Sequence, residues 1–374
     1  MRLLPPLFVA IVLVCVCSAS SARTVGRRVA RATAKARTSV CDRFASTVGS
    51  DQRGWGTSRR PFRSLTRLDR SLRPGQTGCL MGGTYGGWGT WHQIDSDGTS
   101  DAQITIREAP GQVATVVGWV DMVASYTTLE DLRIDGANTL YASRPGTTCR
   151  DHVSQSLTIS GHNDILQYVN YFQLIPALRG DGIGIGFWGD ADDTIIRHDK
   201  IHDVGGCGFY DHLIYLASGN GTQIYDNWLW DDPHGWGIKL DPGPTGARIW
   251  GNVIDHAGSG FNFGNSSGTH PTADNRVFDN TVMNSVGVSN PDIHWSYPGV
   301  LVTSPGMLAS STGNYVWNND SYDNPRGITD LARVVGRSQL SVSDNHRIEP
   351  HFKDAALHDY SLVSAAASKR RGRR

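Results

Sequence analysis

The sequence predicts an all-β solenoid, and three observations support this fold class. Residues 194–264 contain one pattern three times, TIIRHDKIHDVGGCGFYDHLIYLA, TQIYDNWLWDDPHGWGIKLD and ARIWGNVIDHAGSGFNFG. A polar position recurs every 25 to 28 residues, at Asp199, Asn227, Asn252 and Asn280. A repeat of this length cannot bury its own apolar face, so successive copies must stack on one another. Glycine is abundant, at 43 of 374 residues, and helical periodicity is rare, which favours short strands joined by tight turns.

The first 22 residues are typical of a secretory signal peptide. Arg2 supplies a basic start, residues 7–17 form an apolar core, and residues 19–22 are small. The apolar run is too short for a membrane span. We therefore expect a secreted, extracellular protein that has no membrane span after cleavage.

Basic residues concentrate in two tails. Residues 23–39 carry six basic side chains and no acidic one, and residues 369–374 carry five. The remaining body holds 23 basic against 35 acidic residues, a net charge of about −12. We interpret residues 23–39 and 365–374 as disordered, solvated tails and residues 40–364 as the folded domain. We expect this domain to be monomeric and to have no nucleic-acid partner.

One segment, residues 61–72, has a convincing helical pattern. Phe62, Leu65, Leu68 and Leu72 share one face of this predicted helix, Ser58 can cap it, and Pro61 suits its first turn. A solenoid needs its open end covered, and this helix is the natural cap.

Four cysteines remain after signal cleavage, namely Cys41, Cys79, Cys149 and Cys207. An even number in an exported protein permits disulfides. We predict a bond between Cys41 and Cys79, because both flank the N-terminal cap. The absence of a CxxC pair argues against a cysteine zinc site.

Three stretches of the sequence resemble a known group of proteins. They are the opening segment CDRFAS…GTSRRPFRSL…LRPGQTGCLMGGTY, the I-x-x-N repeats, and the closing segment HRIEPHFKDAALHDYSL. Over residues 40–364 the chain resembles the right-handed parallel β-helix repeat proteins, which include pectate, alginate and chondroitin lyases and mannuronan epimerases. The resemblance implies a right-handed parallel β-helix and a polysaccharide ligand. It does not specify the reaction, because this scaffold hosts many chemistries and some proteins that are not enzymes.

The repeated asparagines are predicted to be structural. Asn227, Asn252 and Asn280 are expected at a tight bend, where asparagine tolerates unusual backbone angles. Stacked on successive coils, their amides can also hydrogen-bond to one another.

The second strands of three repeats align residue by residue. These strands are Ile214-Tyr215-Leu216, Ile238-Lys239-Leu240 and Phe261-Asn262-Phe263. By alternation the apolar residues point inward, so Tyr215, Lys239 and Asn262 form an outward column facing solvent, with neighbours about 4.8 Å apart. A structural ladder tends to repeat one residue type, and this column does not.

The column and its neighbours hold the residue types needed for β-elimination or epimerisation of a uronate. The sugar carboxylate must be neutralised, a base must remove the adjacent C5 proton, and an acid must donate a proton. Lys239 is a candidate base or electrostatic neutraliser, and Tyr215 is a candidate acid. His212 and His234 are the alternative bases.

Other nearby residues suit the binding of an acidic sugar. Asn262, Trp236 and Arg248 are the predicted substrate-binding residues. A further group, Asp231, Asp232 and Asp241, is predicted to bind Ca²⁺, which takes oxygen ligands and would bridge an acidic protein to an anionic sugar. A polysaccharide lyase is therefore the preferred function.

Other readings of the same residues stay open. Asp232-Pro233-His234 is similar to a triplet of mannuronan C5-epimerases, although Gly235 and Leu229 stand where that family has glutamate and tyrosine. The pairs Asp192-Asp193 and Asp231-Asp232 are also compatible with an inverting glycoside hydrolase, which needs two separated carboxylates. A non-catalytic module that binds a glycan or a protein along the solenoid is the remaining alternative.

Overall fold

The computed structural model describes residues 41–137, 156–187, 189–206, 211–264, 270–289, 296–297, 301–303, 308–324 and 339–363. These residues all belong to one compact unit that spans residues 39–374. The predicted signal peptide, both basic tails, Cys149 and Cys207 lie outside the described residues. Within the described part of the chain, no helix is long and apolar enough to cross a membrane.

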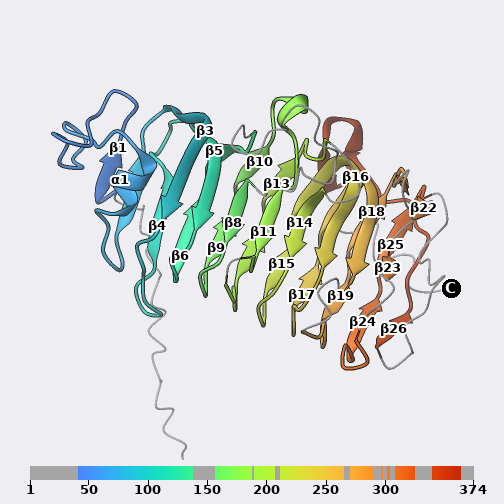
Figure 1. The fold of residues 1–374 in the computed structure, drawn as a ribbon. Coiled ribbons are helices and arrows are strands. Elements are labelled where there is room, and N and C mark those ends of the chain that lie inside the picture. The colour runs from blue at the N-terminus through green and yellow to red at the C-terminus, as the bar shows by residue number, and fades with distance from the viewer. Residues whose placement is uncertain are drawn as a thin grey trace, which may run out of the picture. The chain divides into compact units, whose positions relative to one another are not determined.

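Short parallel strands from successive coils stack into a sheet of eleven strands, which we call the first face (Figure 1). Its strands, in order along the sheet, are β1 (Arg43–Ala45), β2 (Thr77–Leu80), β4 (Ile104–Glu108), β6 (Thr127–Glu130), β9 (Ile165–Gln167), β12 (Ile195–Arg197), β15 (Gln223–Tyr225), β17 (Arg248–Trp250), β19 (Arg276–Phe278), β24 (Asn314–Trp317) and β26 (Leu340–Ser343).

A second sheet of thirteen strands supplies two more faces. Four long strands belong to both faces: β3 (Gly83–Ile94), β5 (Ala114–Met122), β16 (Trp228–Leu240) and β18 (Val253–Phe263). The two halves of β5, β16 and β18 each gain a different further neighbour, whereas both halves of β3 pair with β5. The first halves of the four strands lie on the second face with β7 (Arg133–Asp135), β10 (Asn170–Phe172), β13 (Lys200–His202), β20 (Thr281–Met283) and β25 (Asp320–Tyr322). Their second halves lie on the third face with β8 (Leu157–Ile159), β11 (Ile183–Ile185), β14 (His212–Leu216) and β23 (Leu301–Thr303).

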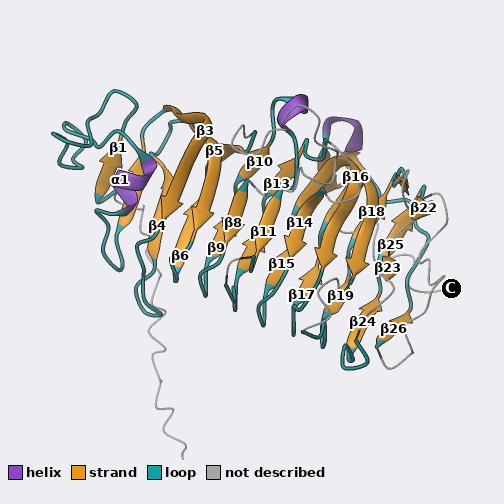
Figure 2. Cartoon of the chain, in the orientation of Figure 1, coloured by secondary structure: helices purple, strands orange, loops and turns teal. Residues whose placement is uncertain are grey.

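The core consists of apolar side chains, mostly aliphatic, stacked in register along each face. On the first face, Ile196, Ile224 and Ile249 pair on successive strands and are fully buried. Ile201, Leu229 and Ile254 do the same on the second face, as do Ile214, Ile238 and Phe261 on the third. Parallel pairing of short strands around one buried core confirms the predicted all-β, right-handed parallel β-helix (Figure 2).

The asparagine ladder is confirmed and extends further than three coils. Each amide Nδ2 donates to the Oδ1 of the next coil at 2.9 Å, in the order Asn227, Asn252, Asn280, Asn319, Asn345. The predicted backbone role was wrong in detail. The left-handed conformation belongs to the residue before each ladder position, such as Asp226 with a φ of 55° and Asp279 with the same value. The ladder side chains instead satisfy backbone groups of neighbouring coils.

The capping helix is present but shorter than predicted. α1 spans Leu65–Asp69, and its N-cap is Ser64 rather than Ser58. The preceding Phe62 forms a parallel bridge with Ala45, so its backbone is extended and cannot be helical. All four apolar residues of the predicted face are nevertheless buried, with Leu65 and Leu68 at most 1% exposed.

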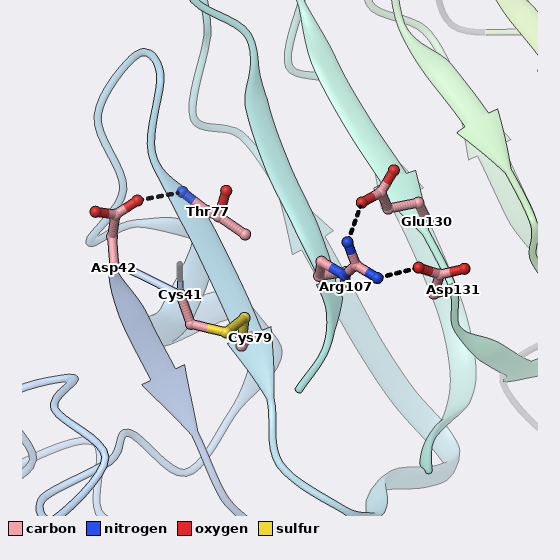
Figure 3. The surroundings of a disulfide bond; sticks show 7 residues. All are labelled: Cys41, Asp42, Thr77, Cys79, Arg107, Glu130 and Asp131. Carbon is pink, nitrogen blue, oxygen red and sulfur yellow. Dashed lines mark hydrogen bonds and ion pairs between the residues drawn. A yellow bond between two sulfur atoms is a disulfide. The ribbon is translucent and has the colours of Figure 1, made fainter. Parts of the chain in front are cut away.

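The predicted disulfide between Cys41 and Cys79 is present, and it ties the start of the cap to β2 (Figure 3). Beside it, the Thr77 backbone N–H donates to the Asp42 carboxylate at 2.8 Å. On β4, the next strand of the first face, Arg107 is the register partner of Cys79 and pairs with Glu130 at 2.9 Å and with Asp131. Covalent and ionic contacts thus join the first coils across strands.

The closing segment folds back onto the solenoid. β27 (Phe352–Asp354) and β28 (Asp359–Leu362) pair antiparallel, joined by the 3₁₀ turn η3 (Ala355–Leu357). The Tyr360 hydroxyl donates to the buried Asp255 carboxylate of β18 at 2.7 Å, and the His358 ring stacks on Trp230 of β16. This hairpin therefore covers part of the second face. Three small elements complete the described structure: η2 (Pro176–Leu178), and β21 (Val288–Ser289) antiparallel to β22 (Ser296–Tyr297).

Candidate active site

The predicted register of the third face is confirmed. Tyr215, Lys239 and Asn262 are direct partners on β14, β16 and β18. The expectation that all three face open solvent was wrong. Tyr215 is half-buried, but Lys239 is only 8% exposed and Asn262 is fully buried. Alternation along a strand correctly places these side chains outside the core, but it does not determine what packs over them.

Lys239 lies at the centre of a compact polar and aromatic cluster. Its Nζ lies 3.2 Å from the Asp241 carboxylate and 4.5 Å from the centroid of the Tyr215 ring. The Trp236 ring is 5.6 Å from the same atom. An ammonium held over aromatic faces and beside a carboxylate is stabilised by both. Lys239 therefore provides a localised positive charge in a largely buried setting.

His212 packs against the same cluster. Its ring is 5.2 Å from Tyr215 and 5.0 Å from Trp236, and the residue is fully buried. Burial, followed by the nearby charge of Lys239, lowers the pKa of His212 well below its usual value. The imidazole is therefore neutral at neutral pH. The Trp236 backbone N–H donates to Nδ1 at 3.4 Å, and Nε2 has no hydrogen-bond partner among the residues that the structure describes.

Three buried aspartates lie next to His212. Asp181 Oδ1 accepts the His212 backbone N–H at 2.6 Å, and Asp211 immediately precedes that histidine. Asp232 accepts backbone N–H groups of His234 and Gly235. Burial, with the charges of Asp211 and Asp181, raises the pKa of Asp232 well above its usual range. The Asp232 carboxyl therefore takes its neutral form at a higher pH than an exposed carboxyl does.

The three residues predicted to bind Ca²⁺ have separate partners. Asp231 pairs with His256 at 2.8 Å, Asp241 pairs with Lys239, and Asp232 is buried in its own turn. Within the described ranges, no group of three histidine, cysteine or acidic side chains is arranged to hold a metal ion.

Two other predicted residues lie apart from the cluster. His234 is exposed in the irregular part of β16 between Asp232 and Trp236, and its backbone rather than its ring contacts Asp232. Arg248 is exposed on β17 of the first face, whereas Lys239 lies on the third. The repeat places Arg248 in a strand that faces another direction, so its assignment to the same substrate site was wrong.

The tryptophans of these repeats mainly stack between coils. Trp250 stacks on Tyr225 at 4.3 Å, and Trp230 stacks on His202 at 4.1 Å. Trp236 is 3% exposed and packs beside Lys239. Since neighbouring rings cover their faces, Trp230 and Trp250 are structural.

A cavity of about 470 Å³ begins immediately beyond the cluster, at Ala217 and Pro242. Its polar lining includes Asp192, Asn220 and His270. Asp192 accepts the Asn220 backbone N–H at 2.7 Å, so this carboxylate orders the turn of the next coil. The cavity volume is in the range of small-molecule sites.

Sequence reasoning missed Asp181, Asp211 and this cavity. The only signal for the two aspartates is that each closely precedes the aliphatic strand of its coil, in GDGIGI and YDHLIYL. No single stretch of sequence predicts the cavity, because the turns of several coils form it together.

Searches with protein-family models and among curated proteins find no match, whereas 32 chains of solved structures match. A rhamnogalacturonan lyase matches with a TM-score of 0.53 and 14% identity, over 88% of this chain and 97% of that chain. An alginate lyase from Paenibacillus sp. str. FPU-7 matches with 0.54 and 15%, over 76% and 92%. Pectate lyase Pel9A matches with 0.55 and 14%, over 83% and 78%. At these identities the likeness shows the shared parallel β-helix fold.

Proposed function

We propose that this protein is a secreted polysaccharide lyase that cleaves a uronate-containing polysaccharide by β-elimination. The observation that carries the proposal is the position of Lys239, a nearly buried ammonium between Tyr215 and Asp241, next to a neutral histidine. Solved lyases with the same fold support the reaction class, and the disulfide supports export.

In the proposed reaction Lys239 pairs with the uronate carboxylate. Neutralising this charge makes the C5 proton more acidic, because negative charge from C5 can then spread into the carboxyl group. The cavity at Ala217 and Pro242 would hold the neighbouring sugar unit.

His212 and Tyr215 would carry the two proton transfers. The substrate must first open the packing over His212, whose Nε2 is buried. His212 Nε2 then takes the C5 proton, the C5–H electrons form the C4=C5 double bond, and the C4–O4 bond breaks. Tyr215 donates its phenolic proton to the leaving O4 atom, and the Lys239 ammonium stabilises the resulting phenolate. Proton return from His212 to Tyr215 restores the enzyme. A base at Nε2 needs the tautomer protonated on Nδ1, so substrate binding must replace the long contact with the Trp236 N–H.

The direct test is incubation of the purified protein with alginate, pectate, rhamnogalacturonan and chondroitin sulfate. A lyase produces ultraviolet absorbance from the C4=C5 product. Absence of this absorbance on every substrate, with added Ca²⁺ and with a chelator, would contradict the proposal. The Ca²⁺ requirement stays a prediction that the same two conditions check.

Substitutions in the cluster provide the second test. We expect Tyr215→Phe and Lys239→Met to reduce kcat/KM about 100-fold or more, because each removes a group that acts in the transition state. Tyr315→Phe and Arg276→Met are matched controls on the exposed first face and should retain activity. Equal activity of all four variants would contradict the assigned roles.

The burial of Lys239 and Asn262 favours one alternative, a non-catalytic glycan-binding module with a structural column. Such a protein would bind an oligosaccharide without forming an unsaturated product, and Lys239→Met would leave that binding intact. A hydrolase would instead release reducing ends without the ultraviolet absorbance.

A further inference from the structure

A second cavity lies at the other end of the solenoid, between the N-terminal cap and β3. Its volume is about 590 Å³, which is within the usual range of small-molecule sites. Asp51, Arg63, Thr84 and Thr90 contribute polar groups to its lining, and Trp91 contributes an indole. None of these residues belongs to the Lys239 cluster.

Trp91 is a large aromatic surface held in a fixed position. It is 52% exposed, yet its ring stacks on Trp119 at 5.6 Å with 19° between the planes. Trp119 Nε1 donates to Thr158 Oγ1 at 3.1 Å, and Thr158 donates to Asp121 at 2.6 Å. Since Thr158 and Asp121 are buried, this chain of hydrogen bonds anchors the stack. A ligand that packs on Trp91 would therefore meet a surface that needs little further ordering.

The backbone beside Trp91 is also constrained. The pairing of β3 with β5 shifts register between Gly86 and Trp91, so the intervening residues form a bulge. Gly118 adopts a φ of +119°, and a Cβ there would lie 2.3 Å from the Thr90 carbonyl oxygen. The bulge thus packs directly on the β5 backbone, which fixes the position of Thr90 next to the indole.

The charge of the cavity is balanced. Arg63 supplies one positive group and Asp51 one negative group, and Asp51 is oriented by the Arg63 and Ser64 backbone N–H groups at 2.7 and 3.0 Å. The imidazole of His92, also in the lining, bonds to the Val117 carbonyl oxygen. Burial lowers the pKa of His92, so its ring adds no positive charge at neutral pH.

We propose that this cavity binds one uncharged pyranose ring of a polysaccharide. The apolar C–H face of the ring would stack on Trp91, as exposed indoles permit. Its hydroxyls would meet the hydroxyl, carboxylate and guanidinium groups of Thr84, Thr90, Asp51 and Arg63. The cavity does not depend on the proposed lyase activity. Its Trp91 lies on the third face, as Tyr215 does, four strand steps or about 19 Å away, so one polysaccharide chain can reach both.

Isothermal titration calorimetry of the purified protein tests the proposal with cellotetraose, xylotetraose and mannotetraose as separate neutral probes, and with tetragalacturonate as the charged comparison. We expect at least one of them to bind and Trp91→Ala to weaken that binding at least tenfold. Trp55→Ala is the matched control, because Trp55 is 67% exposed, lies outside the cavity lining, and is covered by Arg60 at 4.8 Å. The Trp55→Ala protein should bind the same tetrasaccharide as tightly as the wild type does.

Two further variants keep the test decisive if Trp91→Ala lowers the melting temperature. Arg63→Met and Thr84→Val change exposed side chains of the lining, and both should weaken binding without affecting folding. The proposal is overturned if no neutral tetrasaccharide binds the wild type, or if only tetragalacturonate binds. It is also overturned if the Trp91, Arg63 and Thr84 variants all bind as tightly as the wild type.

Discussion

Asp199 occupies the ladder position that asparagine fills on the following coils. Its Oδ1 accepts the Val169 N–H at 2.7 Å, and its own N–H donates to Asn227 Oδ1 at 2.9 Å. Burial raises the pKa of Asp199 well above its usual range. A group whose pKa is raised by folding loses its stabilising contribution as the pH rises through that higher value. The Asp199 carboxyl is thus the ladder group whose ionisation lowers the stability of the folded state, whereas the asparagines of the ladder stay neutral.

We expect Asp199→Asn to increase the free energy of unfolding by about 1–3 kcal/mol at neutral pH. The amide oxygen keeps the Val169 contact, and the new Nδ2 can donate to Asn227 as Asn227 does to Asn252. Urea unfolding of both proteins measures the change. Asn227→Asp is the reverse control and should destabilise; a less stable Asp199→Asn protein would contradict this account.

The register of Lys239 could be predicted from its strand, but its surroundings could not. Its register with Tyr215 and Asn262 follows from alternation alone. Its chemistry depends on Asp241, two residues further along, and on the aromatic rings that cover it. That carboxylate is also one of the predicted Ca²⁺ ligands, and Ca²⁺ binding stays a prediction.

The N-terminal cap combines a very short helix with a covalent link. α1 has only five residues, too few for stability on its own, so its position depends on packing against the first coils. The Cys41–Cys79 bond joins positions 38 residues apart. By restricting the unfolded chain, a loop of this length is expected to stabilise the folded state.

Replacing both cysteines by serine should lower the free energy of unfolding by about 2–4 kcal/mol. Denaturant titration of the variant against the oxidised wild type measures the loss. Wild type treated with a reductant should match the variant, because both lack the same constraint. If the variant is as stable as the oxidised protein, the bond does not stabilise the cap.

Long strands explain why two faces of the solenoid belong to one sheet. β16 and β18 continue across the bend, and their pairing is irregular between Asp232 and Trp236. That irregularity exposes His234 and separates it from the Lys239 cluster. A continuous strand with a local shift in register runs through this segment.

The pH dependence of stability follows from buried groups distributed over the whole solenoid. Burial raises the pKa of Asp69 to about 7 and that of Asp164 to about 8, and also raises the pKa of Asp199 and Asp232. Their contribution to stability increases as the pH falls through these values. Burial lowers the pKa of His92 and His212, so their contribution decreases as the pH falls below the unfolded value of 6.5.

We therefore expect the free energy of unfolding to rise as the pH falls from about 8.5 to 6.5, and to change less steeply below that. Urea titrations at a series of pH values measure the slope. Asp164→Asn should reduce the slope between pH 6.5 and 8 by up to about 1.4 kcal/mol per pH unit, the effect of one proton. A free energy of unfolding that decreases as the pH falls from about 8.5 to 6.5 would contradict the assignment.

The repeat period, the asparagine ladder, the strand register, the buried face of the cap and the disulfide were all predictable from the amino-acid sequence. The period, the ladder and the register depend on the two-residue alternation of strands or on stacking between adjacent coils, and both leave a periodic trace. The buried face of the cap follows from helical spacing, and the disulfide from two cysteines that flank the cap. The ladder Asn227–Asn252–Asn280 and the column Tyr215–Lys239–Asn262 are the clearest cases.

Only the tertiary structure determines which side chains are covered and which groups they contact. Asp231 pairs with His256, Arg248 lies on another face from Lys239, and Tyr360 bonds to Asp255 across 105 residues of chain. Such contacts join turns and segments whose separation is not periodic, so alternation and repeat spacing carry no information about them. The burial of Lys239 and the exposure of Trp91 are of this kind, and the two proposed sites depend on them.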